Sequence, residues 1–448
     1  MYRMIDPPVA WSVADSFEQT AATIAALMSR IHPLLPEGDH LQLVDRSVAW
    51  WAATAADLKQ RIAALEPLPR PVVGPEWIQG PPRPDDVESP AEAAAFFAAL
   101  SSRHALELAE RFPEQVGPLD GAPVALRYAA NHLLAVRHLE DLELRRRALA
   151  ATRNARYGST PNDPWDGFLS ARPSVDLQLV DLDARIVDAE RWAEGHRQFL
   201  LFDPSGDGAI IEVIGELELS RHVAVVIPGV GNDLTNYEQG LRPRATDFYL
   251  GANRPDVAII AWLGYDTPDN LLAATNRHPV DAAASLSDFL AGLDASVRHN
   301  LHTSVIGHSY GSLVTGEAMR VGARADEVVF IGSAGVGVDH VSELALPAGT
   351  QVWVGSAASD PIRLARDLEC LELAPICFPS SDRLFFGLDP TDPAFGAITF
   401  AVDAAPIRDA HASYFEPGSL SLRNLTSIVL GQNHRVIKSG RQTDLVSE

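Results

Sequence analysis

Residues 304–311 read Ser304-Val305-Ile306-Gly307-His308-Ser309-Tyr310-Gly311, and this stretch indicates the fold class. A short apolar run leads directly into a Gly-x-Ser-x-Gly turn, and a helical pattern follows as far as Met319. A serine on such a turn between a strand and a helix is strained, and glycines on either side leave room for the crowded backbone. The stretch therefore predicts a turn that exposes the hydroxyl of Ser309 at the edge of a sheet.

The chain on both sides of this turn alternates short β-branched runs with helical stretches. The expected strands are 199–202, 209–214, 223–227, 257–262, 304–306, 328–331, 351–354 and 398–402. The first two form a hairpin, and the later strands are continuously apolar. Continuous apolar strands between helices are typical of a parallel sheet that is covered on both faces. We therefore predict an α/β domain over residues 196–448.

Helical patterns dominate the first 195 residues. Apolar three-and-four spacings predict a helical hairpin in 1–66. Residues 67–90 contain eight of the 32 prolines, which indicates a linker. Residues 91–195 are expected to form a helical region that packs on the α/β domain or caps it. The hairpin is interpreted as a packing element, with a protein partner bound through these helices as the alternative.

Composition limits the function classes. The chain has 448 residues, of which 46% are hydrophobic and 21% charged, as expected for a globular protein of two domains. The net charge of −23 repels phosphate backbones and anionic lipid surfaces, which argues against a nucleic-acid partner. Two cysteines, Cys370 and Cys377, are too few for a disulfide scaffold. They are expected to be free thiols, with a bond across a loop as the alternative.

Targeting signals are not evident in the sequence. The first residues lack the apolar run of a secretory signal, and no stretch of about 18 apolar residues predicts a membrane span. A cytoplasmic location is therefore expected, and export by a route without a signal stays open.

A serine nucleophile needs a base and a group that orients the base. On a sheet of this type the order along the chain is serine, then an acid after a later strand, then histidine after the last strand. Asp360 follows the strand 351–354, and His411 follows the strand 398–402. We predict that these two residues serve Ser309. The reserves for the two roles are Asp382, Asp389 and His434. His308 is interpreted as a packing or pocket-lining residue.

Two backbone amides should face the oxyanion that forms during acyl transfer. The first candidate is the amide of Tyr310, and the second comes from Pro228-Gly229-Val230-Gly231, after the strand 223–227. This glycine-rich turn lacks the register of a nucleotide-binding loop. Zinc and calcium motifs are also missing from the sequence, so no cofactor and no metal are expected.

Several motifs resemble those of a known superfamily. They are 116–123 (Val-Gly-Pro-Leu-Asp-Gly-Ala-Pro) with Arg127 and Ala130-Asn131, 228–232 (Pro-Gly-Val-Gly-Asn), 307–312 (Gly-His-Ser-Tyr-Gly-Ser), 411–415 (His-Ala-Ser-Tyr-Phe) and 417–419 (Pro-Gly-Ser). Over about residues 93–430 the chain resembles the α/β-hydrolase superfamily, and more narrowly an actinobacterial group of uncharacterised α/β hydrolases.

The resemblance implies an α/β-hydrolase fold, with eight mostly parallel strands, helices on both faces and a serine nucleophile, preceded here by an α-helical N-terminal region. It implies no particular substrate. The His-Gly oxyanion motif of lipases is absent, which leaves the second amide donor open between Val230 and Gly231.

The function expected from these residues is that of a serine hydrolase. Ser309 would attack a carboxylic ester or thioester with a modest apolar acyl group, His411 would take its proton, and Asp360 would hold the imidazole tautomer. The aromatic residues of 361–397 would line the acyl pocket or belong to the core. The alternatives are an acyltransferase with the same triad, and a non-enzymatic binding or secretion-associated protein with a disused triad.

Overall fold

A computed structural model of the chain describes residues 87, 89–157, 172–269, 279–297, 301–363 and 386–439. These residues all belong to one compact unit, Arg83–Glu448. The expected hairpin in 1–66, almost all of the linker, both cysteines and Asp382 lie outside the described residues. Every statement below concerns the described part of the chain.

Eight strands form one sheet in the order β1-β2-β4-β3-β5-β6-β7-β8. They are β1 (Gln198–Asp203), β2 (Ala209–Ile214), β3 (His222–Ile227), β4 (Val257–Leu263), β5 (His302–His308), β6 (Glu327–Ile331), β7 (Gln351–Gly355) and β8 (Ile398–Thr399). The β1–β2 hairpin is antiparallel, and β2 also runs antiparallel to β4. All the other neighbours are parallel. The predicted eight-stranded, mostly parallel sheet is therefore confirmed.

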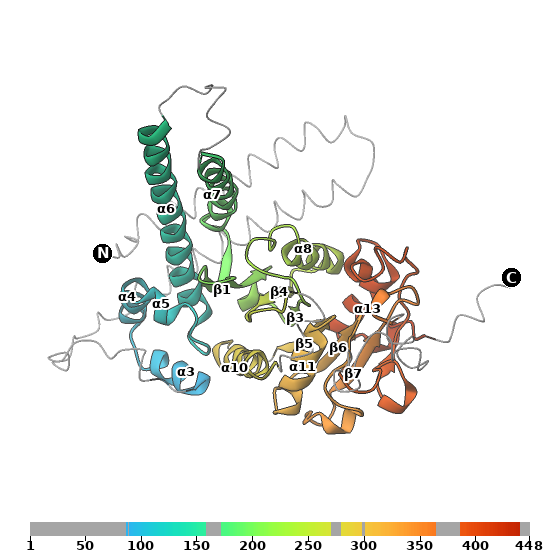
Figure 1. Ribbon diagram of the computed structural model, residues 1–448. Coiled ribbons are helices and arrows are strands. Elements are labelled where there is room, and N and C mark those ends of the chain that lie inside the picture. The colour runs from blue at the N-terminus through green and yellow to red at the C-terminus, as the bar shows by residue number, and fades with distance from the viewer. Residues whose placement is uncertain are drawn as a thin grey trace, which may run out of the picture. The chain divides into compact units, whose positions relative to one another are not determined.

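Helices cover both faces of this sheet, as the apolar strands predict. All seven residues of β4 are buried, which requires a layer of helices on each side. In Figure 1, α8 (Leu241–Ala252) lies on one side of the strands, whereas α10 (Val280–Ser296) and α11 (Gly311–Arg320) lie on the other. The core on the α8 side also includes Leu422 and Leu425 from α13 (Leu420–Val429). The parallel strands thus direct their carboxyl ends toward one shared edge.

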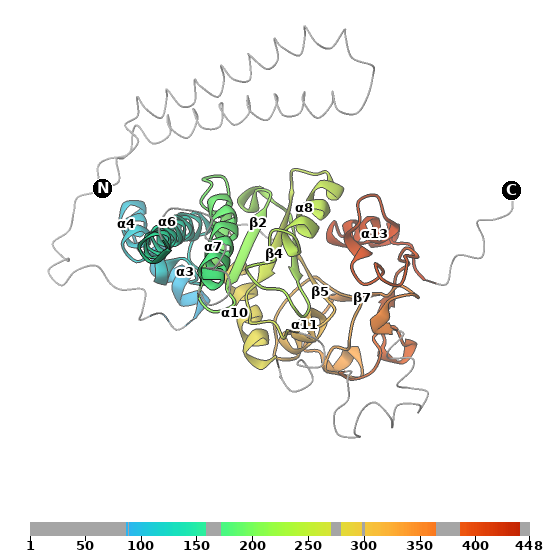
Figure 2. The same ribbon diagram turned by 45° about the horizontal axis from the view of Figure 1, so that its top comes forward.

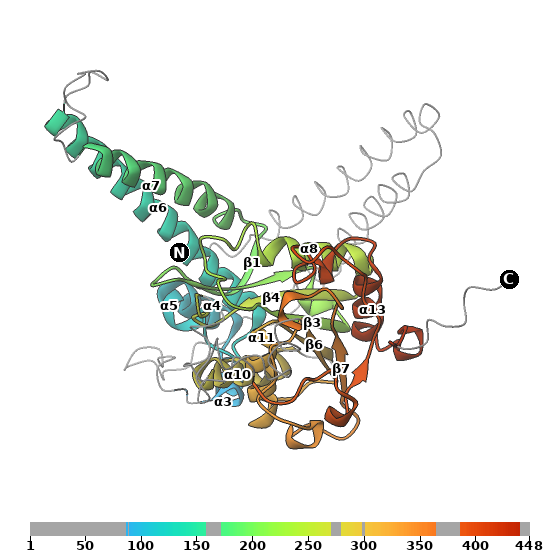
Figure 3. The same ribbon diagram turned by 45° about the vertical axis from the view of Figure 1, so that its right-hand side comes forward.

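The described residues of 91–195 are mostly helical, as expected. Its elements are α3 (Pro90–Ala98), α4 (Ser102–Arg111), α5 (Pro113–Val116), α6 (Val124–Tyr157) and α7 (Arg172–Trp192). Ser89 caps α3 by accepting a hydrogen bond from the backbone N–H of Glu92 at 3.3 Å. The long helices α6 and α7 run side by side in two further views (Figures 2 and 3). None of the described helices is long and apolar enough to cross a membrane.

Two elements differ from the sequence analysis. Helix α7 lies inside the expected helical region, but its bounds were not predicted; of its apolar residues, Leu177 is exposed, whereas Trp192 is buried. Strand β8 has two residues instead of the expected five. The backbone N–H of Phe400 still donates to Val354, but that of Ala401 donates to Ile437, so the chain changes its pairing partner there and the strand ends.

Buried polar side chains join α6 to the edge strand β1. Arg127 donates to the carbonyl oxygen of Leu200 at 2.7 Å, and Asn131 donates to that of Phe199 at 2.9 Å. The amide oxygen of Asn131 accepts the backbone N–H of Phe202 at 3.1 Å. An edge strand leaves backbone groups unpaired. Side chains of α6 satisfy some of them here, at an irregular point in the β1–β2 pairing between Phe199 and Leu201.

Candidate active site

Ser309 occupies the turn between β5 and α11, as the sequence predicts. Its φ is +55°, in the left-handed region that non-glycine residues rarely adopt. A Cβ at Gly311 would lie 2.4 Å from the carbonyl oxygen of Ile227, and one at Gly307 would lie 2.6 Å from that of Gly311. Only glycine fits at these two positions, because residue 311 packs against β3 and residue 307 packs against the backbone of the turn itself. The sharp strand-to-helix turn explains why this pentapeptide has its pattern.

Asp360 follows β7 and is completely buried. Both of its carboxylate oxygens lie 3.0 Å from Nδ1 of His411. It also accepts a hydrogen bond from the backbone N–H of Ile362 at 2.9 Å. Burial raises the pKa of Asp360, but the hydrogen bonds outweigh burial and hold this pKa below its ordinary value. Asp360 is therefore a carboxylate that orients one tautomer of His411, with the proton on Nδ1.

Tyr414 is a member of this site that the sequence analysis missed. Its hydroxyl donates to Oδ2 of Asp360 at 2.6 Å and accepts the backbone N–H of Ala357 at 3.1 Å. Burial, together with the neighbouring Asp360, raises the pKa of Tyr414, so the hydroxyl keeps its proton. The available signal was its position three residues after His411 in a short helical turn, Ser413–Phe415.

Asp360 and His411 lie beside the end of β6, the strand that Ser309 contacts through its backbone. The backbone N–H of Ser309 donates to Ile331, the last residue of β6. A Cβ on the next residue, Gly332, would lie 2.9 Å from Asp360 Oδ2 and 3.1 Å from His411 Cε1. The imidazole of His411 therefore lies next to the backbone of Gly332. Gly332 directly follows Ile331, which accepts the backbone hydrogen bond of Ser309.

The hydrogen bond between the serine and the imidazole is not formed. Neither Ser309 Oγ nor His411 Nε2 has a hydrogen-bond partner among the described residues. In proteins without substrate, hydrogen bonds of this kind are often long or poorly aligned and form only in the complex. The two atoms that such a bond would join are thus both available.

The reserve residues that the structure describes lie elsewhere. Asp389 accepts hydrogen bonds from the backbone and the hydroxyl of Thr391, so it stabilises its own turn. His434 is exposed on the short 3₁₀ helix Asn433–Arg435. Neither residue contacts Ser309 in the described hydrogen bonds.

His308 lies beside His411 instead of lining an open pocket. Its Nε2 is 2.7 Å from the carbonyl oxygen of His411, and the two ring centroids are 4.7 Å apart. The residue is 6% exposed. Burial first, and then the neighbouring His411, lower the pKa of His308 well below its ordinary value, so this ring is neutral.

The loop after β3 covers the serine. A Cβ at Gly229 would lie 2.7 Å from Cβ of Ser309. The backbone N–H of Gly231 donates to Pro268 at 2.8 Å, whereas that of Val230 donates to no described group. Asn232 holds this loop through its side-chain amide, which donates to the carbonyl oxygens of Gly229 and Val230 at 3.0 and 3.1 Å.

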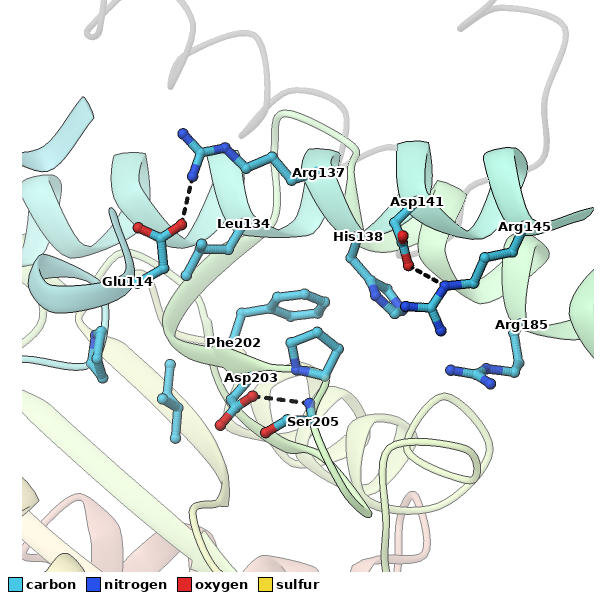
Figure 4. A pocket seen from close by; sticks show the side chains of 13 residues that line it. Glu114, Leu134, Arg137, His138, Asp141, Arg145, Arg185, Phe202, Asp203 and Ser205 are labelled. Atoms are coloured by element: carbon cyan, nitrogen blue, oxygen red, sulfur yellow. Dashed lines mark hydrogen bonds and ion pairs between the residues drawn. The ribbon is translucent and has the colours of Figure 1, made fainter. Parts of the chain in front are cut away.

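A cavity of about 550 Å³ lies away from these residues, between α6, α7 and the end of β1. Figure 4 shows His138 and Phe202 at its wall, with the ion pair Arg137–Glu114 at one end and Arg145–Asp141 at the other. None of its lining residues belongs to the serine site. The described residues also contain no cluster of three or more histidine, cysteine or acidic side chains suited to a metal ion.

Comparisons with known proteins agree with the fold. A family model described as alpha/beta hydrolase matches residues 203–370. An uncharacterized protein of Mycobacterium tuberculosis is 27% identical over 458 residues, covering 95% of this chain and 67% of that protein. An uncharacterized protein of Mycobacterium bovis is 35% identical over 148 residues, covering 30% of this chain and 56% of that protein.

Among solved structures, a dienelactone hydrolase-like promiscuous phosphotriesterase from metagenomic libraries matches with a TM-score of 0.30 and 16% identity, over 51% of this chain and 95% of that one. The strand order identifies the fold without this match. The strand order and the serine turn after β5 show an α/β-hydrolase fold, and the family model matches this chain over residues 203–370. Uncharacterized mycobacterial proteins are among its relatives.

Proposed function

We propose that the chain is a serine hydrolase that cleaves carboxylic esters or thioesters through an acyl-enzyme intermediate. The observation that carries this proposal is the buried carboxylate of Asp360 bonded to Nδ1 of His411, beside a serine at φ +55° on a strand-to-helix turn. A serine nucleophile needs a base and a group that fixes the tautomer of the base, and His411 and Asp360 would fill these two roles.

The chemistry follows from the proton positions. Because Asp360 accepts from Nδ1, the lone pair of His411 is on Nε2, which takes the proton of Ser309 as Oγ attacks the acyl carbon. The alcohol or thiol leaves with that proton. Water then attacks the acyl-enzyme with His411 again as the base, and the acid is released. The Ser309–His411 hydrogen bond forms when substrate closes the gap between the two unpartnered atoms.

The oxyanion is stabilised in this mechanism by the backbone amides of Tyr310 and Val230. Tyr310 is the N-cap residue of α11, where the helix presents partial positive charge. Of the two candidates for the second donor, Gly231 already donates to Pro268, which favours Val230. The side chain of Asn232 holds the loop in place before substrate arrives, as stabilisation of a developing charge requires.

The test compares the wild type with Ser309→Ala on p-nitrophenyl esters and matched thioesters of graded acyl length. The control is Ser333→Ala, which removes a hydroxyl two residues after β6 that accepts a backbone N–H within its own loop. We expect Ser309→Ala to lose activity and Ser333→Ala to retain it. Equal rates in the wild type and Ser309→Ala would remove Ser309 from the mechanism.

Two additions to this assay separate the alternatives. Transfer of the acyl group to added alcohols or amines, faster than to water, would identify an acyltransferase. Labelling of Ser309 by a fluorophosphonate is expected for a working nucleophile. A chain that neither turns over esters nor labels would be a non-enzymatic protein.

A further inference from the structure

We infer that His308 is a positioning residue for His411: its ring donates a hydrogen bond to the carbonyl oxygen of His411 and packs against the His411 ring, which fixes where the base lies. This inference rests on the proposed function, because positioning matters only if His411 acts on Ser309. It assigns a role to the residue next to Ser309, which the sequence analysis interpreted as a packing or pocket-lining residue.

The direction of the hydrogen bond is set by its partner. A carbonyl oxygen only accepts, so the Nε2 atom that lies 2.7 Å from it carries the proton. The two residues are 103 positions apart in the chain, so this bond joins the serine turn directly to the loop that carries the base. This hydrogen bond is partly buried. Nε2 of His308 contacts no second acceptor among the described residues.

Ring packing adds a second restraint. The His308 and His411 centroids are 4.7 Å apart with an interplanar angle of 37°. The same His308 ring lies 6.0 Å from the ring of Tyr414, at 60°. Tyr414 in turn holds Asp360 at 2.6 Å. His308 therefore contacts the base directly and also contacts the tyrosine that orients the acid.

His308 cannot be the base itself. Its Nε2 proton is already donated to a carbonyl oxygen, and its Nδ1 is buried with no hydrogen-bond partner in the described residues. The groups that act on its charge are His411 and Arg244, which oppose protonation, and Asp360, which favours it. Burial outweighs Asp360, so the pKa of His308 lies far below that of a free imidazole. A second positive charge beside the imidazolium of His411 is thereby avoided during catalysis.

Two substitutions separate positioning from packing. His308→Phe keeps a ring of similar shape but removes the donor, and His308→Gln removes the ring but keeps an N–H donor. We expect His308→Phe to lower kcat by about 10-fold to 100-fold with KM within about twofold, because a small displacement of a catalytic group can cost about 10²-fold. We expect His308→Gln to recover most of that loss. A merely structural role predicts the opposite order, since phenylalanine fills the space better.

The pH profile gives a readout that packing would not affect. With His308 neutral, the acid limb of kcat/KM should show one ionisation in the wild type, and the same single ionisation in both variants. Loss of this ionisation in His308→Gln, with activity as low as in Ser309→Ala, would show that His308 is the base and would overturn the inference.

A measurement on the wild type does not depend on how the variants fold. Long-range proton–nitrogen NMR of the histidine side chains should show one ring in the neutral tautomer with the proton on Nε2, unchanged between pH 5 and 8. A His308 ring that titrates in this range, or that carries its proton on Nδ1, would overturn the inference.

The outcomes also separate this inference from the proposed function. Ester hydrolysis that depends on Ser309 but is unchanged in a folded His308→Phe variant would overturn the positioning role alone. Absence of any activity that depends on Ser309 would overturn the proposed function, and the positioning role with it.

Discussion

Two regions of the molecule bury polar side chains, and they differ in how completely these side chains are hydrogen-bonded. Where α6 meets β1, Arg127 donates to two backbone carbonyl oxygens and to Asp120, and Asn131 both donates and accepts. At the carboxyl edge of the sheet, Asp360 is just as well satisfied, but Ser309 Oγ and His411 Nε2 have no described partner.

The difference separates a structural network from a reactive one. A buried network in which each side chain is hydrogen-bonded holds elements in one arrangement. Both regions carry a motif that resembles the same actinobacterial group, so a motif by itself does not distinguish the two roles. The Ser309 hydroxyl and the Nε2 atom of His411 distinguish them, because these two atoms have no hydrogen-bond partner among the described residues.

The largest expected effect is at the reactive network. Asp360→Asn replaces an acceptor by an amide that can donate to His411, which favours the wrong tautomer. We expect kcat for ester hydrolysis to fall by about 10⁴-fold. Asp389→Asn is the control, since that aspartate only stabilises its own turn. If Asp360→Asn kept a tenth of the wild-type kcat, the network around Asp360 would not be the reactive one.

At the structural network, where α6 meets β1, we expect a substitution to lower stability and to leave turnover nearly unchanged. Arg127→Met leaves Asp120 and the carbonyl oxygen of Leu200 without their partner. We expect the free energy of unfolding, measured in urea, to fall by about 3 to 5 kcal/mol. Turnover by the folded fraction should stay within about twofold of the wild type. In the control Arg137→Met, which breaks an exposed ion pair with Glu114, a loss under about 1 kcal/mol is expected.

Tyr414 belongs to the reactive site, but its hydroxyl is fully hydrogen-bonded, as the side chains of the structural network are. Tyr414→Phe removes its hydrogen bond to the Asp360 carboxylate, and hydrogen bonds to charged groups contribute about 1.5 to 3 kcal/mol to stability. We expect a loss of unfolding free energy in this range together with a lower kcat. Tyr249→Phe, on α8, is the matched control and should change neither. A fall in stability with full kcat would assign Tyr414 to structure alone.

The smallest expected effect is the pH dependence of stability. The folded state lowers the pKa of Asp360 below the ordinary 3.8. Its contribution to stability is therefore present above pH 3.8 and is lost as the pH falls through the lowered value. We expect the free energy of unfolding in urea to be higher for the wild type than for Asp360→Asn, and this difference to become smaller as the pH falls. A difference that widened toward acid would mean that the pKa is raised instead.

Local pattern was sufficient for much of the fold. Runs such as Val223–Ile227 and Gln351–Val354 predicted strands because continuous apolar residues occupy a buried sheet in any context. The order of Ser309, Asp360 and His411, after β5, β7 and β8, then indicated which residues to examine together. The bounds of helix α7, inside the expected helical region, were not predicted, because its contact with α6, and not its own periodicity, decides which of its residues are buried.

The amino-acid sequence by itself predicted the serine turn, since part of the crowding is local: a Cβ at Gly307 would lie 2.6 Å from the carbonyl oxygen of Gly311. Three hydrogen bonds were decided only by the tertiary structure. His308 bonds to the carbonyl oxygen of His411, Tyr414 donates to Asp360, and the backbone N–H of Gly231 donates to Pro268. The physical reason is that hydrogen bonds depend on distances of tenths of an ångström between atoms from separate strands and loops. Those distances are set by the register and packing of the sheet, on which local sequence patterns carry no information.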